Sequence, residues 1–308
     1  MWKPTDVCIW KKKSITKKED TEGDAVIKRE DINIRDPFVL VHEGKYYLYG
    51  TRGPECWGKG TGLDVYVSTD LENFEDPVEV FTPPADFWAD LNFWAPEVHK
   101  YEGSFYMFVS FKAEGKCRGT QILKADSPMG PFKVHSDGPV TPRDWECLDG
   151  TLYLEKTDGN RPYMVFCHEW VQVTDGEVCA VELSKDLKKP VGEPKLLFHA
   201  SEAPWVNSIR NGNYVTDGPF VYTDDNGKIT MLWSSFGAEG YTLAVAHSKS
   251  NTIAGPWTQD ENLIFSKNGG HGMIFKSLDG KTMATVHSPN INLKERPVFF
   301  EVKLPEYR

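Results

Sequence analysis

The chain has 308 residues, of which 40% are hydrophobic and 26% are charged, a balance that is ordinary for a soluble globular protein. The formal net charge of −10 repels phosphate backbones, so the composition argues against a nucleic-acid partner. No apolar run approaches the ~20 residues of a membrane helix, so we expect no membrane partner. We also expect the protein to be a monomer.

Two features bear on where the protein acts. The segment from Met1 to Lys18 carries charge but lacks the apolar core of a secretory signal. The six cysteines form no CxxC pair and no metal-binding spacing, which favours free or buried thiols. The chain is therefore cytoplasmic as read, or periplasmic or secreted if a leader has been removed, and the sequence leaves the compartment open.

Five short apolar segments open with Asp, Glu or His and lead through a turn into a second apolar segment. In chain order they are Arg35-Asp36-Pro37-Phe38-Val39-Leu40, Ala95-Pro96-Glu97-Val98, Asp149-Gly150-Thr151-Leu152-Tyr153, Asp217-Gly218-Pro219-Phe220-Val221 and His271-Gly272-Met273-Ile274-Phe275. The spacings between Asp36, Glu97, Asp149, Asp217 and His271 are 61, 52, 68 and 54 residues. A repeat of this period that is built from hairpins is typical of a β-propeller.

A turn rich in Gly follows each of these segments and predicts a tight hairpin, because Gly tolerates positive φ. The turns are Glu43-Gly44-Lys45, Glu102-Gly103, Asp158-Gly159-Asn160, Asp225-Asn226-Gly227 and Asp279-Gly280-Lys281. A third strand follows each hairpin, and outer strands are expected at 78–81, 195–198 and 262–265. Four strands in each of five repeats predict an all-β fold, a five-bladed β-propeller; a β-sandwich is the alternative.

No linker rich in Ser, Pro or Gly divides the chain, so we expect residues 1–308 to form a single domain. Residues 1–24 precede the first repeat and are expected to pack as an N-terminal arm. The first strands of a propeller line its central channel and all start at the same face. The five residues that open the repeats are therefore expected around one axis, and four carboxylates there suggest acid–base chemistry.

The chain resembles glycoside hydrolase family 43 from residue 32 to residue 287. The motifs that carry the resemblance, one in each repeat, are Arg35-Asp36-Pro37, Trp94-Ala95-Pro96-Glu97, Asp149-Gly150, Asp217-Gly218-Pro219 and Gly270-His271-Gly272. Each motif alone is weak, whereas five in order at blade spacing are specific. The resemblance implies an inverting glycosidase that acts on arabinose, xylose or galactose linkages.

The resemblance also implies roles for the carboxylates. Asp36 matches the general base, which activates water, and Asp149 matches the carboxylate that orients the acid and raises its pKa. The family usually has Glu-Gly-Pro where this chain has Asp217, whose side chain is one methylene shorter. Asp217 acts with an adjusted backbone, Glu169 supplies the proton from the neighbouring blade, or the protein is catalytically inactive. We favour Glu169, with Asp217 next as acid or substrate ligand.

Other side chains at the same mouth are expected to bind substrate: Arg35 (or as an ion-pair partner), Trp94, Glu97, His168 and Trp170. Sugar faces pack on aromatic rings, and the rings expected near the mouth are Trp57, Trp88, Phe93, Trp94, Trp145, Trp170 and Trp205, several of which core packing would explain instead. Loops 52–62, 83–93 and 199–216 are expected to wall off a pocket, and a pocket favours exo-action on a terminal sugar.

The axial position of His271 is expected to face the channel, and the resemblance implies that such a His lies beside a water or a bound Ca²⁺ or other cation. Because calcium prefers oxygen ligands, His271 would then contact a water of the cation rather than the metal itself. No other cofactor is required. The expected substrate is then an oligo- or polysaccharide, and the function that the resemblance implies is release of terminal α-L-arabinofuranose from plant polysaccharide side chains. A β-xylosidase or galactan-directed glycosidase is the alternative within the class, and a non-catalytic carbohydrate-binding propeller is the alternative outside it.

Overall fold

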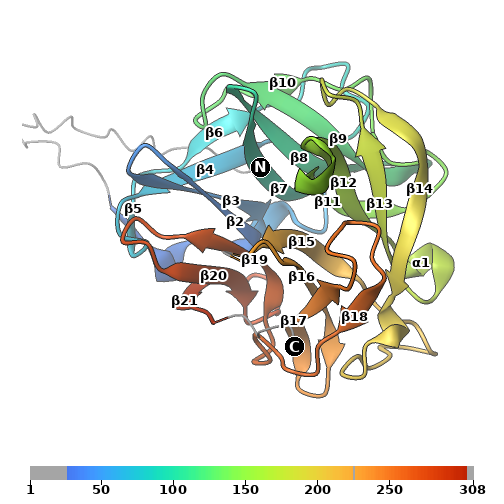
Figure 1. Cartoon of the computed structure of the whole chain (residues 1–308). Helices are drawn as coiled ribbons and strands as arrows, with labels where there is room; N and C mark the ends of the chain where they lie inside the picture. The colour runs from blue at the N-terminus through green and yellow to red at the C-terminus, as the bar shows by residue number, and fades with distance from the viewer. Residues whose placement is uncertain (1–25, 225, 304–308) are drawn as a thin grey trace, which may run out of the picture.

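The computed structural model of the chain describes residues 26–224 and 226–303. In these ranges the chain forms five antiparallel sheets, which stand around a common axis as the blades of a propeller (Figure 1). The predicted all-β class and five-bladed architecture are confirmed. The segment 1–24, predicted as an N-terminal arm, lies outside the described residues.

Blades two to five are each a meander that starts with its inner strand, at the axis, and ends with its outer strand. Blade one holds β1 (Ile27–Lys28), β2 (Ile34–His42), β3 (Lys45–Arg52), β4 (Leu63–Ser68), β5 (Asn73–Phe74) and β6 (Val78–Phe81). Blade two holds β7 (Leu91–Tyr101), β8 (Ser104–Ala113), β9 (Lys116–Ala125) and β10 (Lys133–Val134). Blade three holds β11 (Cys147–Glu155), β12 (Arg161–His168), β13 (Glu177–Leu183) and β14 (Pro190–His199).

Blade four holds β15 (Asp217–Thr223), β16 (Ile229–Gly237), β17 (Gly240–Ser248) and β18 (Trp257–Gln259), and blade five holds β19 (Gly270–Lys276), β20 (Thr282–Ser288) and β21 (Arg296–Glu301). The described helices are short: α1 (Trp170–Val173) and the 3₁₀ turns Arg29–Asp31, Gly53–Glu55, Lys156–Asp158 and Ala200–Glu202. No helix in the described ranges is long and apolar enough to span a membrane.

Strand number departs from four per blade in the first and last blades. Blade five has three strands in the described part of the chain, and β1 pairs with β5 at the outer side of blade one. The outer strand of blade four is Trp257–Gln259 rather than 262–265. The reason is a turn at Asp260, whose carboxylate accepts the Asn262 amide, so that Phe265 keeps only an isolated bridge to Leu243.

The inner hairpins form where the Gly turns predict them. β2 and β3 are joined at Glu43 and Gly44, and β7 and β8 at Glu102 and Gly103. Gly44 and Gly103 have φ of 74° and 84°, a region that side chains with a Cβ rarely adopt. These turns fix the pairing of each inner strand with its neighbour and therefore the place where each inner strand begins at the axis.

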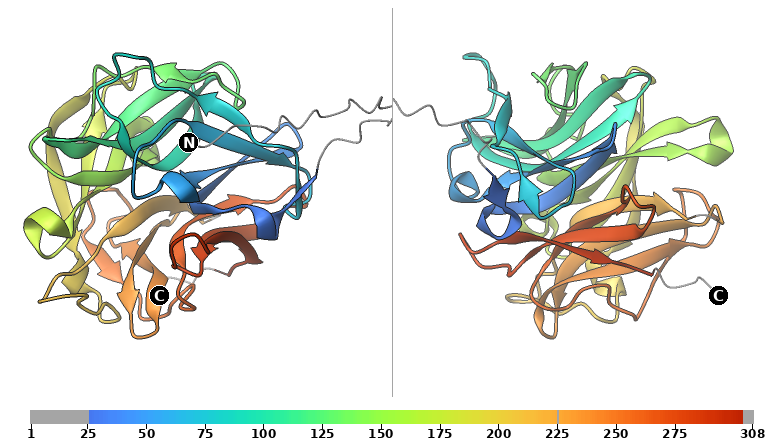
Figure 2. Two further views of the ribbon diagram at one scale, coloured as in Figure 1. Left: turned by 180° about the vertical axis from the view of Figure 1, so that it is seen from behind. Right: turned by 90° about the vertical axis from the view of Figure 1, so that its left-hand side faces the viewer.

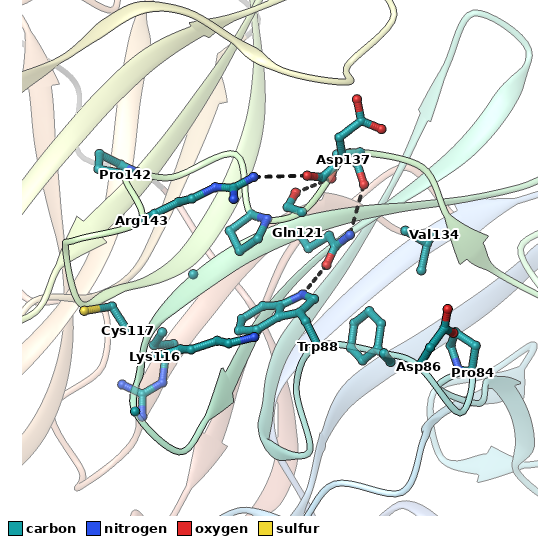
Figure 3. Close-up of a pocket in the computed structure, with 17 residues that line it drawn as sticks. Pro84, Asp86, Trp88, Lys116, Cys117, Gln121, Val134, Asp137, Pro142 and Arg143 are labelled. Carbon is teal, nitrogen blue, oxygen red and sulfur yellow. Dashed lines mark hydrogen bonds between the residues drawn. The ribbon is translucent and has the colours of Figure 1, made fainter.

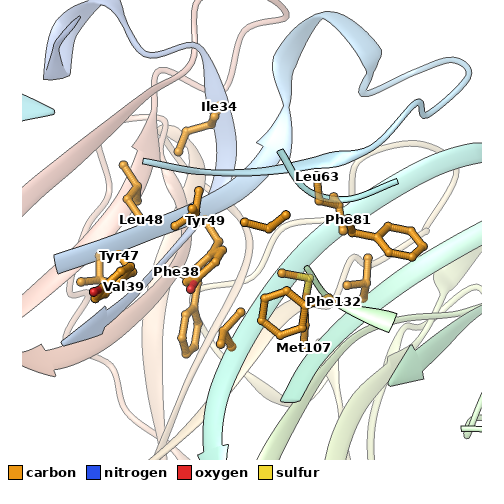
Figure 4. Packing of buried hydrophobic residues seen from close by; sticks show 14 of the residues in the cluster. Ile34, Phe38, Val39, Tyr47, Leu48, Tyr49, Leu63, Phe81, Met107 and Phe132 are labelled. Atoms are coloured by element: carbon orange, nitrogen blue, oxygen red, sulfur yellow. The ribbon is translucent and has the colours of Figure 1, made fainter. Parts of the chain in front are cut away.

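The largest core cluster lies between blades one and two and continues to blade five. Tyr49, Leu48 and Phe81 are fully buried in it, and Figure 4 shows them in one cluster with Met107 and Phe132. The Tyr49 hydroxyl donates a hydrogen bond of 2.7 Å to the Pro128 carbonyl. Apolar packing of this kind holds blade against blade, so the inner strand starts sit in fixed relative positions.

The ring closes between its first and last blades, β2 lying beside β19 (Figure 2). Arg35 at the start of β2 forms an ion pair of 2.7 Å with Glu295, whose side chain is fully buried. Arg296 donates to the Glu30 carbonyl at 2.6 Å. Breaking a buried ion pair leaves an uncompensated charge, so Glu295 fixes both the ring closure and the orientation of Arg35.

Candidate active site

Each inner strand carries a β-bulge close to its first residues, at the same point in all five blades. The bulge residue has a left-handed backbone in every case: Asp36 (φ 53°), Ala95 (φ 49°), Asp149 (φ 59°), Gly218 (φ 51°) and His271 (φ 49°). A bulge re-aims the side chain of the extra residue, here toward the axis. The bulge residues are therefore the five equivalent axial positions.

This register corrects the sequence alignment in two blades. Glu97 and Asp217 were expected to be equivalent to Asp36, but Ala95 and Gly218 occupy those positions. Glu97 lies two residues further along β7, where its carboxylate is buried and contacts His99 Nε2 at 3.0 Å. Asp217 precedes the bulge of blade four, so its side chain belongs to the pocket wall rather than to the axis.

The bulge amides show a second regularity. Four of them donate to a side chain on the second strand of the preceding blade: Asp36 to His287, Ala95 to Thr51, Asp149 to Ser110 and His271 to Ser234, at 2.8–3.1 Å. The fifth bulge amide, that of Gly218 in blade four, would find Cys167 at the equivalent second-strand position of blade three. A thiol is a weak hydrogen-bond acceptor. The Gly218 amide instead donates to Asp149 Oδ2 at 2.9 Å.

Asp36 is buried among groups that favour its ionised form. The Thr51 hydroxyl donates to its Oδ2 at 2.6 Å, and His271 Nδ1 lies 3.2 Å from its Oδ1. Burial pushes the pKa of Asp36 upward, but His271 and Arg35, together with the Thr51 hydrogen bond, lower it below the usual value. Asp36 is therefore a carboxylate near neutral pH, which is the state that a base requires.

His287 keeps its Nδ1 free of a proton, because that nitrogen accepts the Asp36 amide. Burial, against the opposing charge of Asp36, lowers the pKa of His287 to about 3. The ring is therefore neutral at neutral pH, and it stacks on Tyr241 with the centroids 5.5 Å apart. Its part in the geometry is to hold the backbone that carries Asp36.

Asp149 shares the same ring nitrogen of His271 with Asp36, its Oδ2 lying 3.6 Å from His271 Nδ1. Burial, and next the charge of Asp36, raise the pKa of Asp149 well above its usual value. The same Oδ2 accepts the Gly218 amide. Asp149 thus contacts both the His271 ring, which also contacts Asp36, and the backbone amide that follows Asp217.

Asp217 is the carboxyl group with the clearest acidic character at neutral pH. Burial, followed by the charge of Asp149, raises the pKa of Asp217 to about 7. The Tyr241 hydroxyl donates to its Oδ2 at 2.9 Å, which leaves Oδ1 without a donor in the described structure. No Arg or Lys of the described residues forms an ion pair with it. A carboxyl of this kind carries a proton that it is able to donate.

Glu169, at the end of β12, reaches the same pocket but is held by Arg118 Nη1 at 2.5 Å. Burial raises its pKa although Arg118 opposes this. The Arg118 guanidinium also lies over the Trp94 ring, 4.0 Å from the centroid, and donates to Asn92 at 3.2 Å. Direct contact with a guanidinium favours the ionised form of Glu169 and fixes its orientation.

These groups line one pocket at the mouth of the channel, with a volume of about 470 Å³. Of the predicted residues it contains Arg35, Asp36, Trp94, Asp149, Glu169, Trp170, Asp217 and His271. Glu97 and His168 are not brought to it. His168 is buried between Glu177 and Gln172, at 2.8 Å from each, and stacks on Trp145.

The aromatic residues divide in a similar way. Trp57, Trp94 and Trp170 line the pocket, whereas Phe93 packs at 4.8 Å from Phe111 inside the aromatic core and Trp205 packs on Trp233. Of the expected loops, 52–62 and 199–216 contribute to the wall. Loop 83–93 lines a different cavity, on blade two.

Sequence reasoning missed several pocket residues, among them the polar Tyr241, Asn290 and Asn292, and it also missed the buried His287 behind the pocket. His287 stands at the register position of Thr51 and Ser234, so the second-strand pattern of the other blades points to it. Tyr241 follows the short turn between β16 and β17, and no motif marks it. The sequence shows only that Tyr241 stands near the start of the third strand of its blade.

The cation expected near His271 stays a prediction. Within residues 26–224 and 226–303, no group of three or more His, Cys, Asp or Glu side chains is arranged to hold a metal ion. His271 Nδ1 is already engaged by Asp36 and Asp149, and its ring packs on the backbone of Gly218.

The chain is similar to several characterised proteins. The crystal structure of an endo-arabinase from Bacteroides thetaiotaomicron VPI-5482 matches with 41% sequence identity and a TM-score of 0.85, covering 92% of this chain and 99% of that chain. The extracellular exo-alpha-(1->5)-L-arabinofuranosidase ArbA of Cellvibrio japonicus is 25% identical, over 80% of this chain and 72% of its own length. The extracellular endo-alpha-(1->5)-L-arabinanase 1 of Bacillus subtilis is 23% identical, over 77% and 71%.

A family model described as glycosyl hydrolases family 43 matches residues 22–299, which is most of the chain. The chain therefore belongs to glycosyl hydrolases family 43.

Proposed function

We propose that this family 43 glycosidase is an inverting hydrolase that releases terminal α-L-arabinofuranosyl units from arabinan-type polysaccharide. The three relatives described above are all named for arabinose-containing substrates, which supports arabinose over xylose or galactose. Loops 52–62 and 199–216, which contribute to the pocket wall, support action on a chain end. A pocket of about 470 Å³ falls within the ~300–1,000 Å³ range of small-ligand sites.

The observation that carries the proposal is the opposed behaviour of two carboxyl groups in one pocket. The pKa of Asp36 is lowered, and the pKa of Asp217 is raised to about 7. A pair of titratable groups driven apart in this way supplies a base and an acid at the same pH. In inversion, the base takes a proton from water while the acid protonates the leaving oxygen on the other side of the sugar.

In this proposal Asp36 is the general base and Asp217 the general acid. Glu169, which the sequence favoured as the acid, is instead a substrate ligand and an anchor for Arg118. Burial raises the pKa of Glu169 as well, but the Arg118 ion pair opposes its protonation, whereas no Arg or Lys of the described residues opposes that of Asp217. Asp149 orients the acid through the Gly218 amide. Trp57, Trp94 and Trp170 supply faces on which the sugar packs.

The test measures release of nitrophenol from the α-L-arabinofuranoside, β-D-xyloside and β-D-galactoside, beside release of arabinose from linear arabinan. We expect the arabinosides alone to be cleaved, and Asp36→Asn to abolish cleavage of both. Product anomers followed by NMR distinguish inversion from retention. Sugar binding without release from any substrate would support a non-catalytic propeller and would falsify the hydrolase.

A pair of variants assigns the acid. Nitrophenolate leaves without protonation, whereas the natural sugar hydroxyl needs a proton, so loss of the acid affects arabinan most. We expect Asp217→Asn to lower kcat on arabinan about 10²–10⁴-fold and to spare the nitrophenyl substrate. Glu169→Gln is expected to affect both substrates equally. The reverse pattern between the two variants transfers the acid role to Glu169.

A further inference from the structure

A second cavity lies on blade two, outside the proposed active site, with a volume of about 760 Å³ (Figure 3). Three segments form it: the loop between β6 and β7, the hairpin between β8 and β9, and the loop between β10 and β11. Its side chains include Trp88, Lys116, Gln121 and Arg143. None of these four side chains belongs to the catalytic pocket.

Trp88 is held rigidly in this cavity. Its indole Nε1 donates to Gln121 Oε1 at 2.5 Å, and Gln121 Nε2 donates to the Ser136 carbonyl at 3.0 Å. Gln121 is only 2% exposed, so the ring is fixed from a buried position (Figure 3). The polar edge of the indole is thereby satisfied inside the protein. What remains for a ligand is a preorganised apolar ring face, which costs little conformational entropy to use.

The charges around the cavity balance. Lys116 and Arg143 are exposed cations, and Asp86 and Asp137 are exposed anions. Arg118, the remaining cation, is paired with Glu169. Lys116 Nζ lies 5.8 Å from the centroid of Trp88, where it reaches a ligand hydroxyl above the ring. A neutral ligand with an apolar face and hydroxyl groups fits this lining, whereas a phosphate or uronate gains no net attraction.

Arg118 links the cavity to residues of the catalytic pocket. Arg118 lines the cavity, and its guanidinium contacts Trp94 and Glu169, both of which line the pocket. The two spaces therefore have Arg118 as a common neighbour. A sugar chain with its end in the pocket has to cross Arg118 to reach Trp88, a short path for an oligosaccharide.

We propose that the cavity around Trp88 binds inner sugar residues of the neutral polysaccharide whose terminal residue occupies the catalytic pocket. This rests on the proposed function for the identity of the sugar. Trp88 stacks on one pentose ring, and Lys116 and Arg143 donate to its hydroxyl groups. The site increases affinity for polymer over short substrates without touching the reacting bond.

Binding is tested apart from catalysis, with the full chain carrying Asp36→Asn, by electrophoresis in gels that contain linear arabinan or polygalacturonate. We expect arabinan to retard this protein, and Trp88→Ala to weaken the retardation about tenfold in apparent Kd. Lys116→Ala with Arg143→Ala is expected to weaken it less. Lys249→Ala, an exposed lysine on blade four, is the matched control and should change nothing.

Loss of the tryptophan can also loosen the blade, so Trp88→Phe, which keeps a ring, is measured beside it. Partial recovery of arabinan binding by Trp88→Phe, at an unfolding midpoint equal to that of Trp88→Ala, supports stacking. Retardation by polygalacturonate instead of arabinan overturns the neutral ligand. Unchanged arabinan binding in Trp88→Ala overturns the site.

Kinetics of the active chain separate this inference from the proposed function. We expect Trp88→Ala to raise KM for arabinan about tenfold and to leave the nitrophenyl arabinofuranoside unaffected. Equal losses on both substrates overturn the site while hydrolysis stands. Arabinan retardation that depends on Trp88, in a protein that cleaves no substrate, overturns the hydrolase while the site stands.

Discussion

The raised pKa of Asp217 makes a prediction about stability that is independent of any activity assay. A carboxyl whose pKa is about 7 in the folded protein and 3.8 when unfolded binds its proton more tightly in the folded state. Stability from this group is complete below pH 3.8 and is lost as pH rises to about 7. Three pKa units correspond to about 4 kcal/mol of unfolding free energy.

Asp217→Asn removes this dependence, because the amide stays neutral while its oxygen still accepts the Tyr241 hydroxyl. We compare the free energy of unfolding of the variant with that of the parent chain by urea denaturation at pH 4.5 and at pH 8. The difference should shift by about 3 kcal/mol in favour of the variant between the two pH values. Glu239→Gln, an exposed carboxylate on the turn between β16 and β17, is the control and should show no such trend. An equal effect of Asp217→Asn at both pH values refutes a raised pKa.

Three further predictions concern the same pocket. The rate on arabinan should fall as pH rises through about 7, where Asp217 loses its proton, as a pH–rate profile will report. Gly218→Ala places a Cβ 2.6 Å from His271 and should destabilise the fold by about 1–3 kcal/mol in thermal or urea unfolding, more than Gly44→Ala, whose Cβ meets nothing within 4 Å. Cys167→Ser offers the Gly218 amide a hydroxyl and should lower kcat by releasing Asp149, whereas Cys167→Ala should not.

The five-fold period was readable from the sequence, because each repeat places a Gly turn after an apolar segment. That was enough to predict the propeller and the face on which the inner strands begin. It also brought Asp36, Asp149 and His271 correctly to one axis, since all three stand at the bulge. The pocket around them followed from the fold rather than from any single motif.

The exact register of each inner strand was not readable, because bulges change which residues face the axis without changing composition. Glu97 and Asp217 were therefore assigned to the axis, where Ala95 and Gly218 stand. The partners of the polar groups were equally hidden. Nothing local to Glu169 shows that Arg118, 51 residues earlier, will hold it.

The register also explains why the same repeated segment gives an ionised carboxylate in blade one, Asp36, and a protonated carboxyl in blade four, Asp217. At the bulge position, Asp36 meets the Thr51 hydroxyl and the His271 ring, which support a carboxylate. At the preceding position, Asp217 corresponds to Leu148 of blade three, on the pocket wall, and there burial dominates its pKa. The acidity of Asp217 thus comes from its place in the blade and not from side-chain length. Replacement of the usual Glu by Asp changes how far the carboxyl reaches, while the environment that protonates it stays the same.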